Sequence, residues 1–211
     1  MSRIKVSIGL PMTTSNVYAV TMSRNSNSVN IDKKPYHHGD LRQSLISEGL
    51  RMLSERDADS LSLRELARSV GVSATSVYRH FPDKEALMTA LALEGLAQLG
   101  AAQRAASDAV GGGAAGFKET GRAYVRFALA NPALFRLIFA SPALLVGGVK
   151  SDIGSEAHNL LQANAAATVR RGGGDQEVRA VQSWALVHGL AMLMLDGQVA
   201  VDDELIEKAI C

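Results

Sequence analysis

The chain has 211 residues, of which 47% are hydrophobic and 20% are charged, a composition that supports one large globular domain or two small ones. Its net charge of +1 excludes a polycation that coats nucleic acid or anionic membranes indiscriminately, so any basic surface must arise from the fold. One cysteine, Cys211, excludes an intramolecular disulfide and a cysteine metal cluster, which fits a cytoplasmic protein.

Residues 1–34 are rich in Ser, Thr and Asn and lack helical or strand periodicity, which predicts a disordered N-terminal arm. The arm carries five Lys/Arg against one acid, so it is either a basic segment that contacts phosphates or a tail without a role. Met12 and Met22 leave the true start of the protein open. The first thirty residues lack an apolar run of signal-peptide length, and no later stretch reaches membrane-spanning length free of charges, so we expect no membrane partner.

The next residues predict two helices in succession. From Asp40 onward apolar residues recur at helical spacing, and Asp40 is placed to cap the first helix. After a turn, Ser62 and Glu65 match the Ser-x-x-Glu capping box, which starts a second helix over about 62–70.

Two further helices follow closely. Gly71 ends the second helix, and Ser73 caps a short third helix over 74–81. The Pro-Asp pair at 82–83 ends this helix and starts a fourth, over about 84–99.

Two glycine triplets, 111–113 and 172–174, interrupt the rest of the chain and indicate flexible connections. No strand precedes them and no Gly-Lys-Ser/Thr follows, which argues against phosphate-binding loops. Further helices are expected over 115–130, 132–139, 142–171 with possible breaks, 175–196 and 203–210. Because strand-like alternation persists nowhere, the fold class is all-α.

Two helices joined by a short turn containing glycine form a helix-turn-helix, in which the second helix enters the DNA major groove. The helical wheel of the third helix turns one set of side chains inward: Ala74, Val77 and Phe81. It turns a second set outward: Thr75, Ser76 and Arg79. Small residues at a helix N-terminus can approach base edges closely, and hydroxyls can donate or accept there.

Three polar residues flank this tip and suit phosphate oxygens: Tyr78, His80 and Lys84. Taken singly, each has an alternative explanation: Tyr78 as a half-buried aromatic residue, His80 as a residue at a helix end, and Lys84 as a solvated charge. Their joint occurrence behind a capped helix and Gly71 favours a DNA-binding role.

This stretch closely resembles the TetR family of bacterial transcriptional regulators over residues 38–87. The resemblance is carried by four motifs: Leu61-Ser-Leu-Arg64-Glu-Leu-Ala67, Gly71-Val72-Ser73, Tyr78-Arg79-His80-Phe81 and Lys84-Glu-Ala-Leu87. The segment "YHHGDLR" at 36–42 is similar to the opening of the first helix in one large branch of the family. Asp57 stands where the family commonly has glycine, so we expect Asp57 to keep that turn in a strained, positive-φ conformation.

The resemblance implies the roles of individual residues. It places base-proximal positions on Ala74, Thr75 and Ser76, and phosphate-binding positions on Tyr78, His80 and Lys84. Ala74 offers only a methyl group, so Arg64 becomes the candidate for a strong base contact, with a salt bridge or a phosphate clamp as the alternative. The full predicted DNA-binding set is Arg64, Ser73, Ala74, Thr75, Ser76, Tyr78, Arg79, His80 and Lys84.

Beyond residue 99 the resemblance rests on "NPALFRLIF" at 131–139 and on Trp184, His188 and Gly189 within "WALVHGLAMLML". These are similar to the signature of one TetR C-terminal domain type, which implies effector binding and pairing of two subunits. Apolar residues surround the helix that carries Trp184, as expected when one face meets its own core and another a partner. A homodimer also places two recognition helices about 34 to 36 Å apart, one turn of DNA.

An apolar and aromatic set is the candidate ligand site, with plain core packing as the alternative for each member. The set is Phe117, Tyr124, Phe127, Phe135, Phe139, Trp184, His188 and Met192. It suits a small apolar or aromatic effector, and His188 either orients that molecule or is a satisfied core histidine. The five histidines show no metal-ligand spacing, so neither a metal nor a cofactor is expected.

These observations predict three parts: a disordered arm over 1–34, a helix-turn-helix domain over 35–83, and an effector-binding and dimerisation domain over 84–211. The expected function is a sequence-specific transcriptional regulator that binds double-stranded, palindromic operator DNA as a homodimer and is released by a ligand. One alternative is an enzyme that uses the C-terminal cavity, but the sequence contains no catalytic motif. A second is an architectural DNA binder without sequence specificity, and the near-neutral net charge argues against it. Operator, effector, regulated genes and the choice between repression and activation stay open.

Overall fold

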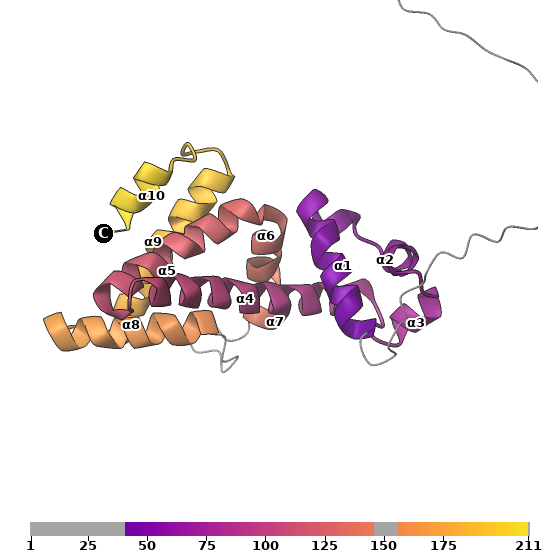
Figure 1. Ribbon diagram of the computed structural model, residues 1–211, viewed down its shortest axis with the longest axis horizontal. Helices are drawn as coiled ribbons and strands as arrows, with labels where there is room; N and C mark the ends of the chain where they lie inside the picture. The colour runs from indigo at the N-terminus through magenta and orange to yellow at the C-terminus, as the bar shows by residue number, and fades with distance from the viewer. Residues whose placement is uncertain (1–40, 146–155, 211) are drawn as a thin grey trace, which may run out of the picture. The chain divides into compact units, whose positions relative to one another are not determined.

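A computed structural model describes residues 41–145 and 156–210, which all belong to one compact unit, Tyr36–Cys211. The predicted arm, the Asp40 cap, and Cys211 lie outside the described residues. Within the described ranges every regular element is helical, which confirms the all-α class (Figure 1). The elements are α1 (Leu41–Glu55), η1 (Ala58–Ser60), α2 (Leu63–Val70), α3 (Ala74–Tyr78), α4 (Lys84–Ala109), α5 (Gly113–Ala130), α6 (Pro132–Ala140), α7 (Pro142–Leu145), α8 (Glu156–Gly172), α9 (Gln176–Leu195) and α10 (Asp203–Ala209).

The first three α-helices and η1, here called the head, fold around apolar side chains spaced for helices. Leu45 and Leu66 are fully buried, so α1 and α2 pack through their apolar faces. The turn after α1 differs from expectation. Asp57 has φ −69°, in the extended region, and precedes η1 as its N-cap, so the expected positive-φ strain at Asp57 is wrong. The chain forms a short 3₁₀ turn there, a conformation open to any residue.

Helix α4 begins where expected but continues well beyond residue 99, to Ala109. Asp83 caps its start by accepting a hydrogen bond from the Ala86 amide at 2.8 Å. No residue between 99 and 109 breaks a helix, and the chain turns only at the first glycine triplet, where Gly111 to Gly113 all have positive φ. The predicted helix ended near residue 99 because the residues after it are rich in alanine. Alanine favours a helix but does not show which side of it is buried.

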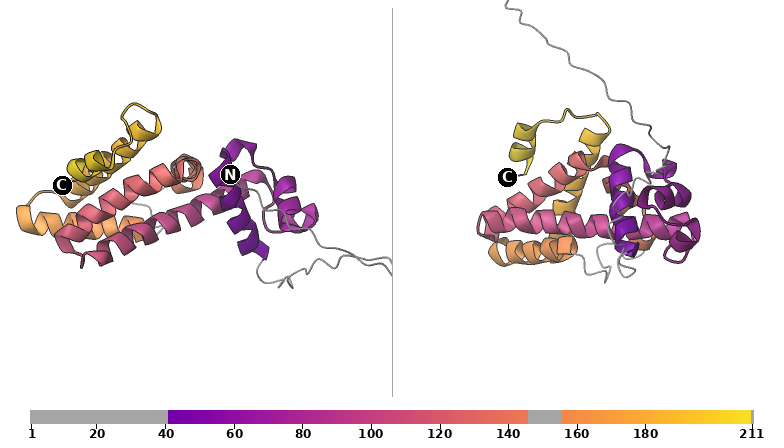
Figure 2. Two further views of the ribbon diagram at one scale, coloured as in Figure 1. Left: turned by 45° about the horizontal axis from the view of Figure 1, so that its top comes forward. Right: turned by 45° about the vertical axis from the view of Figure 1, so that its right-hand side comes forward.

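The remaining helices pack around the C-terminal half of α4. Helices α5 and α8 both lie against α4, and α9 lies against α5 and α8 (Figure 2). The last helix, α10, packs on α5 through Ile206, as does Ile210 directly after it, and Arg122 and Arg126 of α5 form ion pairs with α10. Arg126 pairs with Asp203 at 2.9 Å and with Glu207 at 2.7 Å.

Helix α6 belongs to two apolar cores at once. Leu134 and Ile138 lie in the core of the head, together with residues of α1 to α4. Phe135, one position along, lies in the core of the C-terminal helices. The crossing of α6 over α4 is close, because a Cβ at Gly95 would lie 2.6 Å from Leu134 Cδ1. Glycine at position 95 therefore permits this approach, and any movement of α6 presses directly on α4.

Candidate functional site

The short helix α3 is held by two local devices that the sequence encodes. Gly71 ends α2 in the left-handed conformation, φ 77°, and its N–H bonds to the carbonyls of Ala67 and Arg68. After this turn Ser73 caps α3, with its hydroxyl accepting from the Ser76 amide at 3.1 Å. Val77 is fully buried beneath the helix, so the opposite side of α3 faces outward.

The outward side of α3 carries the predicted reading and flanking residues. Thr75, Tyr78, Arg79 and His80 are exposed, with Tyr78 at 43%. Ser73 and Ser76 lie with their hydroxyls 2.8 Å apart, so both take part in the cap. In the part of the chain that the structure describes, the Thr75 hydroxyl has no hydrogen-bond partner, which leaves it available to a base edge.

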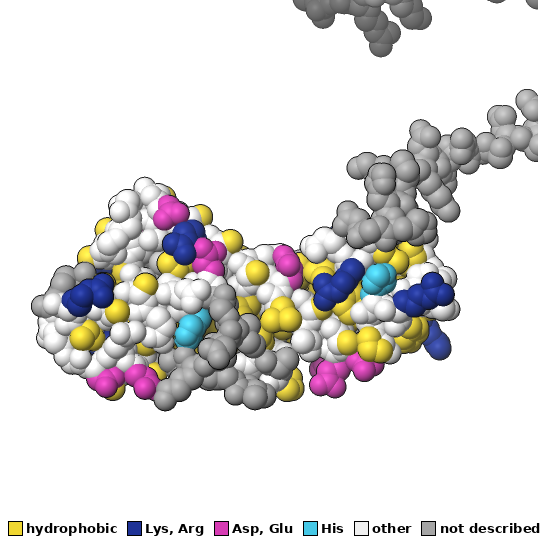
Figure 3. All heavy atoms as spheres, turned by 90° about the horizontal axis from the view of Figure 1, so that it is seen from below, with side chains coloured by type: hydrophobic (Ala, Val, Ile, Leu, Met, Phe, Trp, Pro, Cys, Tyr) yellow, Lys and Arg dark blue, Asp and Glu magenta, His cyan; other side chains and the backbone are white. Residues whose placement is uncertain are grey.

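Positive charge without acidic partners surrounds this helix. Arg64, in the first turn of α2, and Arg68, one turn later, are both exposed, as is Arg79. Within the described ranges none of the three forms an ion pair. Figure 3 shows dark blue side chains and a histidine gathered on the surface of the head. These three arginines give part of the head's surface a positive charge although the whole chain is near neutral.

Two cations occupy positions that the sequence did not reveal. Lys84 is half-buried, and its ammonium donates to the carbonyl oxygen of Asp59 at 2.6 Å, which ties η1 to the start of α4. Arg42, on α1, places its guanidinium 5.5 Å from the centroid of the Phe81 ring. Arg42 thereby adds an exposed cation beside the end of α3, and its only sequence signal is its place in the motif "YHHGDLR".

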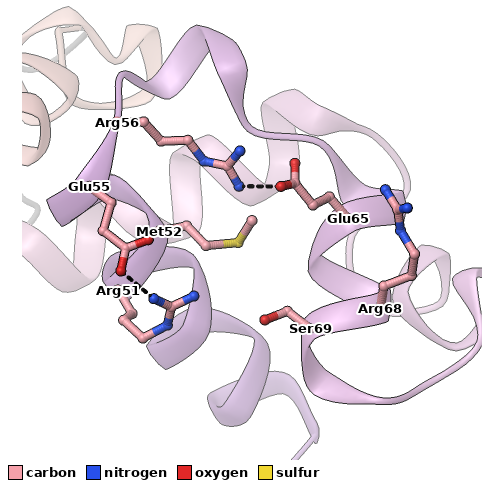
Figure 4. Close-up of a pocket in the computed structure, with 7 residues that line it drawn as sticks. All are labelled: Arg51, Met52, Glu55, Arg56, Glu65, Arg68 and Ser69. Carbon is pink, nitrogen blue, oxygen red and sulfur yellow. Dashed lines mark hydrogen bonds and ion pairs between the residues drawn. The ribbon is translucent and has the colours of Figure 1, made fainter.

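A cleft of about 660 Å³ lies between α1 and α2 and is lined by Arg51, Met52, Glu55, Arg56, Glu65, Arg68 and Ser69 (Figure 4). Most of the charged side chains that line the cleft pair with one another: Arg51 pairs with Glu55 at 2.6 Å, and Arg56 pairs with Glu65 at 2.8 Å. Glu48 accepts from Arg51 and from the Ser69 hydroxyl, and these bonds lower its pKa. The bonds from Arg56 to Glu65 and from Ser69 to Glu48 join α1 and the turn after it to α2.

In the C-terminal helices the structure brings most of the predicted ligand set together. Five rings are in mutual contact: Tyr124, Phe135, Phe139, Trp184 and His188. Neighbouring centroids lie as close as 4.8 Å, between Phe139 and His188. Phe127 and Met192 pack at the edge of this cluster, which we call the aromatic cluster. Phe117, almost two turns before Tyr124 on α5, is not among its residues.

A hydrogen-bond relay runs through the aromatic cluster. The indole N–H of Trp184 donates to the Tyr124 hydroxyl at 3.2 Å, and that hydroxyl lies 2.9 Å from His188 Nδ1. Trp184 Nε1 can only donate, so among the described residues Nδ1 of His188 is the one partner that can accept the proton of the buried Tyr124 hydroxyl. This pairing places the proton of neutral His188 on Nε2. Burial raises the pKa of the Tyr124 hydroxyl and lowers the pKa of His188, so the relay is uncharged near neutral pH.

The lowered pKa of His188 predicts a loss of stability in acid. The unfolded chain binds a proton near its ordinary pKa of about 6.5, whereas the folded chain binds it only at lower pH. The contribution of neutral His188 to the free energy of unfolding is therefore fully present above about pH 6.5. It falls as the pH drops from about 6.5 through the lower pKa of the folded chain. Urea unfolding at about pH 7.5 and about pH 5.5 measures the effect. A His188→Gln variant should lose less stability between the two pH values, and an equal loss would contradict the prediction.

One buried polar residue escaped the sequence reading. Gln103, on α4, is 8% exposed, and its amide N–H donates to the Thr120 carbonyl on α5 at 3.1 Å. Its Oε1 is buried without a hydrogen-bond partner among the described residues. An unmet acceptor of this kind costs about 1 to 3 kcal/mol. The signal in the sequence is a polar residue that continues the apolar stripe of Leu96 and Leu99 at helical spacing.

Helix α9 presents large apolar side chains to solvent. Val178, Val181, Leu186 and Leu193 are between 41% and 52% exposed. Taken alone among the described helices, α9 is long and apolar enough to cross a membrane, with a mean hydropathy of 1.3. Its other side packs against α5 and α8, through residues such as the buried Ala191 and Met194. An exposed apolar face on a packed helix is typical of a protein interface.

Two family models match the chain. The model described as "Bacterial regulatory proteins, tetR family" matches residues 45–91, and the one described as "Tetracyclin repressor-like, C-terminal domain" matches residues 117–210. The first covers α2, α3 and the start of α4, which hold the helix-turn-helix. The second covers the helices that carry the aromatic cluster.

Solved structures share the same fold. A protein of unknown function from Rhodococcus sp. RHA1 is 30% identical with a TM-score of 0.67, over 84% of this chain and 95% of that one. A TetR-family transcriptional regulator from Streptomyces coelicolor is 20% identical with a TM-score of 0.57, over 83% and 79% of the two chains. A TetR family transcription regulator from Marinobacter aquaeolei VT8 is 20% identical with a TM-score of 0.57, over 82% and 92%.

Proposed function

Because the chain belongs to the TetR family of bacterial transcriptional regulators, we propose that it binds a palindromic operator as a homodimer and is released from it by a small ligand. Within this proposal the protein is a repressor, whose release by the ligand allows transcription, and it acts in the cytoplasm. The family assignment favours a regulator over the enzyme considered above. The observation that carries the proposal is the outward face of α3, where the Thr75 hydroxyl and three nearby arginines have no partner among the described residues.

This face supplies both kinds of contact that specific DNA binding needs. Thr75 offers a hydroxyl and a methyl group to base edges, and the tip of α3 has no long side chain to hold it away. Tyr78, Arg79 and His80 surround the tip with groups that bind phosphate oxygens. Lys84 would bind a phosphate with the hydrogens that its bond to Asp59 leaves free.

The exposed face of α9 supports a homodimer. A C2 dimer buries the same patch on both subunits, and the apolar residues of α9 give a patch that can pair with itself. Gly189 lies on this side of the helix, and a Cβ built there meets nothing within 4 Å, so a second helix can approach. Two heads fixed in this way read two half-sites of a palindrome.

The double role of α6 supports release by a ligand. A ligand that enters the aromatic cluster contacts Phe135 or Phe139 and so displaces α6. Leu134 and Ile138 on the same helix then shift against the head core and against Gly95 of α4. A differential affinity of about 1 to 3 kcal/mol changes operator occupancy by about five- to a hundredfold, so a small displacement suffices.

Selection from random duplex DNA tests the proposal. The full chain should enrich palindromic sequences whose half-site centres are about 10 base pairs apart. Replacing Thr75 and Ser76 with alanine and Tyr78 with phenylalanine should lower affinity for the selected site at least about tenfold. Binding to unrelated DNA should stay nearly unchanged, because it depends on the remaining cations.

A matched control uses the same helical scaffold. Gln98→Ala alters an exposed residue of α4 remote from α3 and should leave operator binding intact. If the triple variant binds the selected site as tightly as the unaltered protein, α3 does not read the DNA. If no sequence is enriched, the protein is not a specific DNA binder.

A further inference from the structure

The unmatched acceptor of Gln103 lies close to the aromatic cluster. Its amide bonds to the carbonyl of Thr120, and Tyr124 follows four residues later on α5, about 6 Å along the axis. On α4, Leu99 lies one turn before Gln103 and packs in the same core as Tyr124. The acceptor and the relay therefore belong to one region between α4, α5 and α9.

The region offers one acceptor and one donor, both neutral. Gln103 Oε1 accepts, and nothing among the described residues donates to it. His188 is half-buried, and the relay places its remaining proton on Nε2, where it can be donated. The surrounding side chains are aromatic, and Phe139 and Trp184 are only partly buried.

We propose that the effector is an uncharged, planar aromatic molecule that donates a hydrogen bond to Gln103 Oε1 and accepts one from His188 Nε2. This inference rests on the proposed ligand-released function and names the chemistry of that ligand. A charged ligand is disfavoured, because the aromatic cluster holds no ionised side chain to compensate it. A hydroxyl or amide N–H on the ligand recovers the free energy that the unmet acceptor costs.

The position of Gln103 also links the ligand to the DNA. Oε1 is sealed at the contact of α4 with α5, so a donor reaches it only when these helices separate. Helix α4 continues into the head, where Leu87 and Leu91 are fully buried. A ligand bound to Gln103 therefore acts on α4 directly, in addition to its action through α6.

Two fluorescent probes that differ in one hydrogen-bond donor test this. 7-Hydroxycoumarin, at a pH where its hydroxyl is protonated, offers a donor and a carbonyl acceptor, and 7-methoxycoumarin lacks the donor. We expect the full chain to bind the hydroxyl compound about tenfold more tightly. In a Gln103→Met variant, which keeps the length of the side chain, this preference should disappear. Gln98→Met, on the exposed side of the same helix, should keep it.

Thermal unfolding of the variant supplies a readout that needs no ligand. Gln103→Met removes the bond to the Thr120 carbonyl together with the buried, unmatched acceptor, so the two effects offset and the melting temperature should stay nearly unchanged. A clear fall would mean that Oε1 holds a structural water in solution, and would overturn the inference. The inference would also be overturned if the unaltered protein and Gln103→Met showed the same preference for 7-hydroxycoumarin, or if neither probe bound. Tighter binding of 7-hydroxycoumarin-3-carboxylate than of 7-hydroxycoumarin would overturn it as well.

Operator binding, measured in parallel without probe, separates this inference from the proposed function. A protein that binds its selected operator but neither coumarin refutes only the ligand chemistry. A protein that binds 7-hydroxycoumarin through Gln103 but selects no DNA sequence refutes the regulatory function and keeps the ligand site.

Discussion

Replacing Leu186 and Leu193 with glutamate is expected to convert the protein from a dimer to a monomer and to remove specific operator binding. Both side chains lie on the exposed face of α9, at 50% and 41% exposure. Burying a leucine contributes about 1.5 to 3 kcal/mol, and each substitution acts twice across a two-fold axis. Four carboxylates in an apolar interface add repulsion and desolvation, so dimerisation should fail at micromolar concentration.

Light scattering after gel filtration measures this directly. The unaltered protein should have twice the chain mass of 22.3 kDa, and the double variant should have the chain mass itself. Affinity for the selected operator should fall at least about a hundredfold, because one head offers too few contacts for specific binding. The matched control places glutamate at Val201 and Leu205, exposed apolar residues outside α9. A double variant that remains a dimer would place the interface elsewhere.

Arg64→Ala is expected to relax specificity at one base pair of each half-site. Arg64 is exposed in the first turn of α2 and has no acidic partner among the described residues, whereas Arg51 and Arg56 are held by glutamates. A free guanidinium that binds guanine in bidentate fashion contributes about 1 to 3 kcal/mol of discrimination. Lysine cannot reproduce this geometry, so Arg64→Lys should keep overall affinity better than base preference.

Binding to operators with single base changes measures the effect. Arg64→Ala should bind the variants of one position almost equally, and Arg68→Ala, one turn later on α2, should weaken all sites alike. The slope of affinity against salt should fall for Arg68→Ala if Arg68 contacts a phosphate. An unchanged preference at every position in Arg64→Ala would mean that Arg64 reads no base.

Helix boundaries fixed by neighbouring residues could be predicted from the sequence. Ser62, Ser73 and Asp83 cap helices where expected, because an N-cap needs only a side chain and an amide three residues away. Gly71 also ends α2 where expected, because glycine adopts the left-handed conformation without strain. Asp57 was predicted wrongly because the family comparison suggested a glycine-like turn, whereas the chain forms a 3₁₀ turn with ordinary φ.

Contacts between distant segments could not be predicted. Lys84 bonds to a carbonyl 25 residues away, and the amide of Gln103 meets a carbonyl 17 residues away. Both acceptors are backbone carbonyls, so no pair of complementary side chains in the sequence indicates either hydrogen bond. The aromatic cluster was anticipated because its members are chemically distinctive, yet Phe117 shows that an aromatic residue on the right helix need not join it. The DNA contacts themselves stay predictions.

The membership of α6 in both cores bears on how regulators of this kind can be recombined into biosensors. A chimaera joined at residue 83 would take the reading head from this protein and its sensor from another. It would lose Leu134 and Ile138, which complete the apolar packing beneath α1 and α4. A graft has to carry the native α6 sequence with the head, or choose a donor whose corresponding helix offers the same two side chains opposite a glycine.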